Sequence, residues 1–149
     1  MRRPRLYPPV WFVANVMLVV ALHYFAPISV PMPPLHMAAG SFLITVGIVM
    51  TLVAIFTFSR HHTPVLPFRQ PETLLCHGVF RWSRNPIYLG ETFILAGIAL
   101  RVGELLPWLV VLLFIVGLNR GPIAWEERAL REKFGADFDR YCHRTRRWL

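Results

Sequence analysis

Residues 87–119 form the longest apolar run of the chain and read IYLGETFILAGIALRVGELLPWLVVLLFIVGLN. The 33 residues of this run exceed the roughly 20 that one helix needs to cross the hydrocarbon core of a bilayer. Arg101 and Glu104 interrupt the run, and Pro107 follows them. We therefore expect a helical hairpin of two membrane spans, at about residues 87–100 and 105–119. Each half is short for a crossing, so the flanking turns must lengthen it or the bilayer must thin locally.

Two further apolar runs lie upstream of the hairpin, at residues 10–26 and 36–58. They hold 17 and 23 residues and no Lys, Arg, Asp or Glu. The whole chain has 149 residues, of which 55% are hydrophobic and 16% charged, and its mean hydropathy is +0.47. A chain this small and apolar cannot hide its hydrophobic residues in one soluble core. We therefore expect a single all-α integral membrane domain over residues 1–149, with four transmembrane helices and a cytoplasmic cap formed by residues 59–85 and 120–149.

The basic residues are distributed unevenly about these four spans. Of the 16 Lys and Arg residues, 15 fall in the N-terminal segment, the second loop and the tail, and only Arg101 lies on the other side. Because cytoplasmic segments carry the excess of Lys and Arg, we expect both termini in the cytoplasm, in a bacterial inner membrane or in the endoplasmic reticulum. We interpret the first span as an uncleaved anchor, since no convincing small-x-small cleavage site follows it.

This asymmetry, together with attraction to anionic lipid headgroups, accounts for the net charge of +8. No nucleic-acid-binding motif accompanies the charge, so we expect membrane lipid, and not nucleic acid, as a partner. Cys76 and Cys142 both fall on the side where thiols stay reduced, and neither belongs to a CxxC or Cys/His ligand pattern. We therefore predict neither a disulfide nor a metal site.

The tail has apolar residues at helical spacing. Ile123, Leu130, Phe134 and Phe138 recur on one face, which indicates an amphipathic helix over residues 122–141 that is either continuous or broken at Gly135. We expect its apolar face to dock on the bundle.

The second loop is rich in proline, and we expect it to pack under the bundle. Its residues 63–68 form either a strap that lies on the lipid or a simple connector. His61 and His62 are expected to be interfacial residues and not ligands.

Polar residues cluster at the entrance to the hairpin. Residues 81–90 read RWSRNPIYLG, which places two arginines, an asparagine and a tyrosine next to a membrane span. Glu126 and Glu127, near the start of the tail helix, fall on the same predicted cytoplasmic side. Taken alone, each feature has a structural explanation, since acidic residues favour the start of a helix and arginines face lipid headgroups. Together they predict one cleft in which opposite charges meet.

Two glycines of the hairpin, Gly90 and Gly97, lie seven residues apart and therefore share a helical face. Residues this small allow the close approach of a neighbouring helix or of a ligand. Helix packing is the simpler of these two explanations.

The motifs follow one another in a recognisable order. HGVFR occupies residues 77–81, RNPIYLG residues 84–90 and EE residues 126–127, and Leu130, Phe134, Gly135, Phe138 and Tyr141 follow. In this order and spacing, the chain resembles the isoprenylcysteine carboxyl methyltransferase and phospholipid methyltransferase superfamily over about residues 64–149. The resemblance implies S-adenosylmethionine as methyl donor, bound between the hairpin and the C-terminal helix at the membrane surface. It also implies a lipidic or hydrophobic acceptor that enters from the bilayer.

S-adenosylmethionine carries a sulfonium, an ammonium, a carboxylate, a ribose and an adenine, and the motifs offer partners for these groups. Arg84 suits the carboxylate, Glu126 or Glu127 the ribose or the ammonium, and the ring of Tyr88 the cation. The expected cofactor-binding residues are His77, Gly78, Val79, Phe80, Arg84, Asn85, Pro86, Tyr88, Leu89, Gly90, Glu126, Glu127 and Tyr141. The expected catalytic residues are Arg84, Asn85, Tyr88 and Glu91.

Glu91 lies just inside the predicted third span, where an acidic group is costly and usually functional. An amine acceptor must lose its proton, and Glu91 is then the candidate base, whereas a carboxylate acceptor needs none. Alternatively, Glu91 pairs with Arg81 or Arg84 at the cytoplasmic edge of the span. The sequence leaves the acceptor open among a prenylcysteine, a phospholipid amine, an isoprenoid acid and a quinone-like molecule.

Two other functions remain open at this point. Membrane sterol reductases resemble the same superfamily, and this chain shares with them Gly90-Glu91 and Tyr141-Cys142, which would make NADPH the cofactor and hydride transfer the reaction. The chain could instead be a non-enzymatic membrane subunit whose basic tail binds anionic lipid or a partner. The 15-to-1 bias of the basic residues needs no active site to explain it.

Overall fold

The computed structural model describes residues 7–60 and 73–149, and within these ranges the chain is all-helical. Its helices are α1 (Pro8–Phe25), α2 (His36–Arg60), α3 (Pro86–Val102), α4 (Leu106–Arg120), α5 (Pro122–Phe134) and α6 (Ala136–Arg144), with a 3-10 turn, η1, at Gly78–Arg81. The described residues form no strand, although Ser29 and Glu104 make an isolated β-bridge. The expected strap at residues 63–68, His61 and His62 lie outside the described residues.

Proline and glycine set the helix limits. Pro8, Pro86, Pro107 and Pro122 lie in the first turns of α1, α3, α4 and α5, where a proline costs no helical hydrogen bond. The first half of the hairpin is longer than expected, with 17 residues in α3, whereas α4 has 15 residues and is shifted by one residue from the expected span. The tail helix breaks at Gly135, the second of the two expected forms, and there φ is +49°, in the left-handed region that favours glycine.

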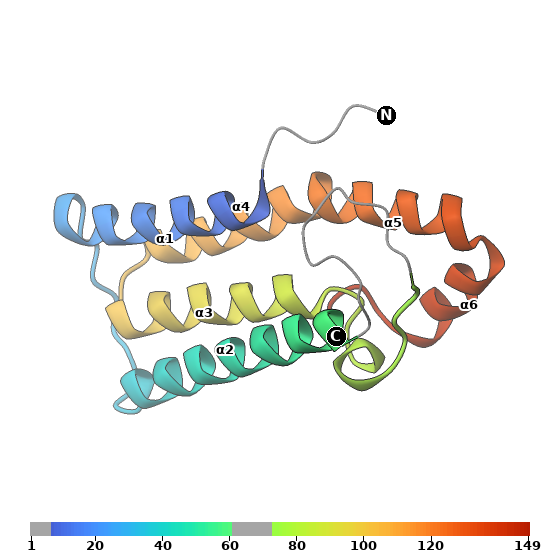
Figure 1. The fold of residues 1–149 in the computed structure, drawn as a ribbon. Helices are drawn as coiled ribbons and strands as arrows, with labels where there is room; N and C mark the ends of the chain where they lie inside the picture. The colour runs from blue at the N-terminus through green and yellow to red at the C-terminus, as the bar shows by residue number, and fades with distance from the viewer. Residues whose placement is uncertain (1–6, 61–72) are drawn as a thin grey trace.

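The long helices form two layers (Figure 1). In one layer α1 lies beside α4, and in the other α2 lies beside α3. Helix α5 continues α4 beyond the bundle, and α6 turns back towards η1 at the same end. Between the layers lies a core whose fully buried side chains are Val19, Leu95, Ala99, Phe114, Leu118 and Ile123. One end of the bundle is therefore capped by α5, α6 and η1.

The closest helix contact joins α2 to α3 through glycine. A Cβ atom on Gly90 would lie 2.6 Å from the carbonyl oxygen of Gly47, and one on Gly97 would lie 2.6 Å from that of Gly40. The shared face of Gly90 and Gly97 therefore receives a neighbouring helix. This packing holds α3 flat against α2 and fixes which face of α3 turns towards α5.

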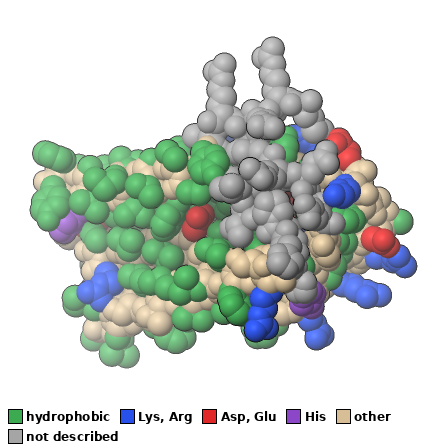
Figure 2. Space-filling view, in the orientation of Figure 1, with side chains coloured by type: hydrophobic (Ala, Val, Ile, Leu, Met, Phe, Trp, Pro, Cys, Tyr) green, Lys and Arg blue, Asp and Glu red, His purple; other side chains and the backbone are tan. Residues whose placement is uncertain are grey.

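Three helical segments among the described residues are long and apolar enough to cross a membrane: Pro8–Phe25, His36–Arg60 and Leu106–Phe134. The third joins α4 to α5, but its apolar part is α4, because α5 carries six charged side chains. Helix α3, with 17 residues, is not among the three, so the fourth crossing stays a prediction. Hydrophobic side chains cover the body of the bundle, whereas several Lys, Arg, Asp and Glu side chains gather at the end formed by α5 and α6 (Figure 2).

Candidate functional site

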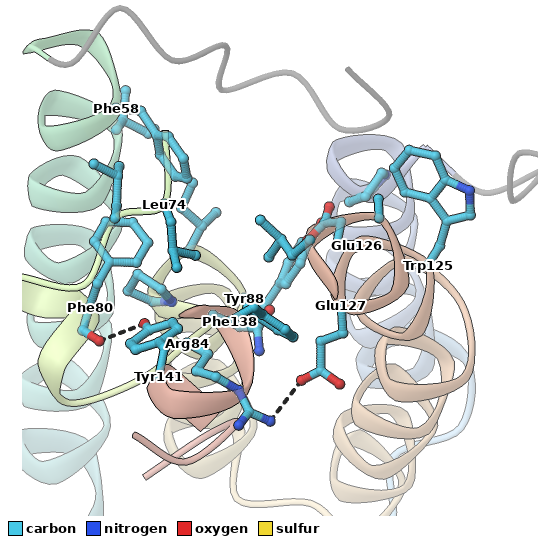
Figure 3. Close-up of a pocket in the computed structure, with 18 of the residues that line it drawn as sticks. Phe58, Leu74, Phe80, Arg84, Tyr88, Trp125, Glu126, Glu127, Phe138 and Tyr141 are labelled. Carbon is cyan, nitrogen blue, oxygen red and sulfur yellow. Dashed lines mark hydrogen bonds and ion pairs between the residues drawn. The ribbon is translucent and has the colours of Figure 1, made fainter. Parts of the chain in front are cut away.

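A cavity of about 380 Å³ opens at the capped end of the bundle. Its walls come from the start of α1 and from α2, α3, α5 and α6, with η1 and the segment before it closing one side. The volume lies within the roughly 300–1,000 Å³ of small-molecule sites. Figure 3 shows aromatic side chains around this space, with two glutamates on α5 and an arginine below them. The cavity therefore combines apolar walls with a few charged groups.

Tyr88 and Glu126 connect α3 to α5 across this cavity. The Tyr88 hydroxyl donates a hydrogen bond of 2.7 Å to Glu126 Oε1. Burial raises the pKa of Glu126 to about 7, an increase that the hydrogen bond from Tyr88 opposes and the charge of Glu127 favours. A carboxyl with this pKa is present in both protonation states near neutral pH. A bound cation would shift it to the charged form.

Glu127, the next residue, is held by two arginines. Its Oε1 accepts hydrogen bonds from Arg84 Nη2 at 2.8 Å and from Arg147 Nε at 3.0 Å, and its Oε2 accepts one from Arg147 Nη2. Burial alone would raise the pKa of Glu127, but the hydrogen bonds and charges of Arg147 and Arg84 outweigh it, so the pKa lies below its usual range. Glu127 is therefore a charged anchor for two guanidinium groups.

Arg84 is fixed on several sides, and one of its donors is left over. Nη1 donates to the carbonyl oxygens of Thr145 at 3.1 Å and Cys142 at 3.4 Å, and Nη2 donates to Glu127. Nε is buried and has no partner among the described residues. A buried N–H without a partner is costly, and Arg84 lines the cavity. An anionic group that bound in the cavity and reached Nε would satisfy this donor.

Glu91 lies one helical turn beyond Tyr88 on the cavity face of α3. The residue is 8% exposed, and its Oε2 has no partner in the described part of the chain. No ion pair joins it to Arg81 or Arg84, both of which the structure describes. The expected alternative, an ion pair at the edge of the span, is therefore wrong. Glu91 instead presents an unsatisfied oxygen in the wall of the cavity.

Asn85 and Tyr141 hold the walls together. The Asn85 side chain donates to the carbonyl oxygen of Arg147 at 3.0 Å, so its amide N–H faces the tail. The Tyr141 hydroxyl donates to the carbonyl oxygen of Phe80 at 2.6 Å and ties α6 to η1 (Figure 3). Burial raises the pKa of Tyr141, so its hydroxyl stays protonated.

The cavity brings most of the sequence-predicted residues together. Those that line it are Phe80, Arg84, Asn85, Pro86, Tyr88, Glu91, Glu126, Glu127 and Tyr141. Those that do not line it are His77, Gly78, Val79, Leu89 and Gly90. Successive helical residues turn by about 100°, so Leu89 and Gly90 face away from the side of α3 that Tyr88 and Glu91 share. Residues 77–79 lie in the sequence between two lining residues, Leu75 and Phe80, but do not themselves line the cavity.

Sequence reasoning missed several cavity residues. Pro8 and Pro9 of α1, Thr51 of α2 and Trp125 of α5 all line the cavity. Thr51 carried a signal that could have been used, since it is a polar residue inside an apolar span. Arg147, which does not line the cavity but binds Glu127, carried no such signal, because an arginine in a basic tail is indistinguishable from the other charges of the tail.

The charged groups suit a ligand with charges of both signs. The Arg84 Nε donor can receive a carboxylate, while Glu91 Oε2 and Glu126 can face a cation. S-adenosylmethionine, with one carboxylate and two cationic centres, fits this set. Within residues 7–60 and 73–149, no group of three or more His, Cys, Asp or Glu is arranged to hold a metal ion, and Cys76 and Cys142 are free thiols.

Comparison with known proteins adds an independent finding. The sequence model of the family described as phospholipid methyltransferase matches residues 35–137, which run from the start of α2 into α6. An uncharacterized protein of Haemophilus influenzae is 43% identical over 63 residues, which are 42% of this chain and all of that protein. The family match includes Thr51, Arg84, Glu91 and the acidic pair of α5, whereas Arg147 lies outside it.

Proposed function

Since the chain belongs to the phospholipid methyltransferase family, and is thus a membrane methyltransferase, we propose that it transfers a methyl group from S-adenosylmethionine to a lipidic or hydrophobic acceptor at the cytoplasmic membrane surface. One observation carries this proposal. One cavity presents an arginine donor and two carboxylates, Glu91 and Glu126. Among the described residues the donor has no partner, and no arginine pairs with either carboxylate. A zwitterionic donor with an additional sulfonium charge complements Arg84 and Glu126, and Glu91 is left for the acceptor.

The proposed roles on the donor side follow from the contacts. Arg84 Nε binds the carboxylate of the donor, and Glu126, oriented by the Tyr88 hydroxyl, faces its cationic groups. When bound, the donor supplies a methyl group that is already activated by the positive sulfur. The chain therefore needs no nucleophile of its own. Its residues orient the two reactants and exclude water, which together can lower a barrier by several kcal/mol.

On the acceptor side, the cavity is bounded by the apolar side chains of Ile55 and Phe58 on α2. Other hydrophobic residues of α2 are widely exposed, as expected of a helix in contact with lipid. We propose that the acceptor enters along this helix. Glu91 then takes the proton of an amine acceptor, because its Oε2 has no partner among the described residues and it lies on the same face of α3 as Tyr88.

A variant of Glu91 tests the acceptor side on its own. Glu91→Gln keeps the shape of the side chain but removes its basicity, so methylation of amine acceptors should fall at least a hundredfold while donor binding stays within about threefold. Parallel loss of donor binding would assign Glu91 to the donor instead. An unchanged rate with an amine acceptor would exclude it as the base.

The membrane arrangement is part of the same proposal. Helices α1 to α4 cross the bilayer, with α3 held between α2 and the α1–α4 layer, and α5 and α6 lie at the cytoplasmic surface with both termini on that side. The charged side chains on α5 and α6 support this orientation, because basic residues mark the cytoplasmic side.

Calorimetric titration of the purified protein in lipid nanodiscs distinguishes the proposed function from its alternatives. We expect binding of S-adenosylmethionine and no binding of NADPH. Binding of NADPH alone would make the protein a reductase of the sterol-reductase kind. Binding of neither would leave a non-enzymatic lipid-binding subunit.

A further inference from the structure

The segment that follows α6, residues 145–148, is bonded along its length to the entrance of the hairpin. The backbone N–H of Arg84 donates to the Arg146 carbonyl oxygen at 3.0 Å. The Ser83 hydroxyl and the Asn85 side chain both donate to the Arg147 carbonyl oxygen, at 3.2 and 3.0 Å. The segment thus fixes the backbone on both sides of Arg84.

The Arg147 side chain extends this contact to α5 and α4. Two of its nitrogens, Nε and Nη2, bind the two oxygens of Glu127, and Nη1 donates to Asn119 Oδ1 at 3.2 Å. Trp148 Nε1 donates to the same Asn119 oxygen, also at 3.2 Å. A planar guanidinium that meets a carboxylate with two parallel hydrogen bonds holds it in one orientation. Arg147 therefore fixes the carboxylate that in turn holds Arg84.

These contacts give the two neighbouring glutamates of α5, Glu126 and Glu127, different partners. Glu127 has both oxygens occupied by arginines, and its side chain is only 13% exposed. Within the described part of the chain, the Glu126 side chain has one hydrogen bond, from Tyr88, and it lines the cavity. Glu126 is thus the member of the pair left for a ligand cation, and Glu127 acts on the ligand through Arg84.

The cluster of Arg84, Arg147 and Glu127 also has a net positive charge. Arg84 and Arg147 carry two positive charges against the single negative charge of Glu127, so one positive charge is left over. The guanidinium that carries part of this excess charge is that of Arg84, whose Nε has no partner among the described residues. An anionic group at this point would complete the cluster.

We propose that Arg147 is a positioning residue for the methyl donor. With Glu127 it holds the Arg84 guanidinium so that its free Nε donor meets the carboxylate of the donor. The inference rests on the proposed function and names a residue outside the part of the chain that the family model matches. Arg147 does not contact the donor itself. Its removal therefore weakens the binding of a ligand that has this carboxylate and spares one that lacks it.

Two ligands that differ in this respect provide the test. S-adenosylhomocysteine carries the amino-acid carboxylate, whereas 5′-methylthioadenosine shares its nucleoside and lacks the amino-acid portion. Their dissociation constants are measured by calorimetry for the wild type and for Arg147→Met, which keeps an unbranched side chain without the guanidinium. We expect Arg147→Met to weaken the binding of S-adenosylhomocysteine at least tenfold and the binding of 5′-methylthioadenosine less than twofold. Arg146→Met is the matched control, because the Arg146 side chain is exposed and only its carbonyl oxygen meets Arg84.

Arg147→Lys covers the case in which Arg147→Met does not fold. A lysine retains the charge but not the two-point contact with Glu127, so we expect a smaller loss with the same selectivity. An equal loss for both ligands, or no loss for either, would overturn the positioning role. If the wild-type protein binds neither ligand, the proposed function itself is wrong. That outcome differs from the two that overturn only the role of Arg147, because in those the wild type still binds both ligands.

Discussion

The Tyr88 hydroxyl and Glu126 Oε1 lie 2.7 Å apart and join α3 to α5, although the two residues are 38 positions apart in the chain. This hydrogen bond closes the cavity between α3 and α5. It also sets the orientation of the carboxylate that we assign to the donor cation. Removing either partner takes this hydrogen bond from the other, and of the two Tyr88 is buried and Glu126 half-buried.

Tyr88→Phe should therefore destabilise the protein. The change leaves the half-buried Glu126 without its hydrogen-bond donor, which costs about 1–3 kcal/mol. Thermal unfolding in detergent should show a lower Tm than for the wild type. Tyr24→Phe is the control, because Tyr24 is 75% exposed, and it should leave Tm unchanged. Equal Tm values for Tyr88→Phe and the control would show that the hydrogen bond contributes nothing.

Donor binding should depend on pH through Glu126. The pKa of this carboxyl is raised to about 7, so raising the pH from 6 to 8 converts it from mostly neutral to mostly charged. A cation binds the charged form, so binding of S-adenosylmethionine should tighten over this range, by up to about tenfold. Calorimetry at several pH values measures the change.

Two variants identify the group responsible. Glu126→Gln should flatten the profile and hold the affinity at the weak, low-pH value. Glu91→Gln removes the other cavity carboxylate without an arginine partner and should leave the profile in place. A pH dependence that survives in Glu126→Gln would assign the titration to another group.

Glu127→Ala should weaken donor binding tenfold or more, about 1.4 kcal/mol, because Arg84 loses the partner that holds it. Glu132→Ala provides a matched control, since Glu132 lies on the same helix and is exposed. The control should bind the donor as the wild type does. Wild-type affinity in Glu127→Ala would refute the assigned role of this carboxylate.

Gly90→Ala should disturb the packing of α3 on α2. The added Cβ would lie 2.6 Å from the Gly47 carbonyl oxygen, a backbone atom that cannot move aside cheaply. Overpacking of this kind typically costs about 1–3 kcal/mol. Gly47→Ala places its Cβ at the same contact from the other side and should lower Tm similarly. A wild-type Tm for both would show that the two helices are not packed this closely.

Local sequence signals predicted most of the helical fold. The apolar runs, the interruption at residues 101–104 and the glycine at position 135 each act along one continuous stretch of the chain, so their effects can be predicted without the tertiary structure. Helical periodicity likewise predicts that Gly90 and Gly97 share one face of a helix, which a neighbouring helix can approach closely. The count of crossings is harder, because α3 is short and its length depends on what it packs against.

The candidate site could be predicted only in part, because its pairings are long-range. The sequence placed the acidic pair of α5 near the Arg84 motif, but nothing in it assigned Glu126 to Tyr88 and Glu127 to Arg84. Those partners are 38 and 43 residues apart and depend on the angle between α3 and α5. Arg147 reaches Glu127 from a non-helical segment, for which no periodicity gives a direction.

Methyl transfer by the purified protein tests the central claim most directly. The protein in lipid nanodiscs is incubated with a lipid extract and methyl-labelled S-adenosylmethionine, and the label in the lipid fraction is measured. We predict that the wild type labels a lipidic acceptor and that Glu126→Gln, assayed at pH 8, labels it at least tenfold more slowly. Absence of labelled product from the wild type across the whole extract, or an equal rate for Glu126→Gln, would contradict the account.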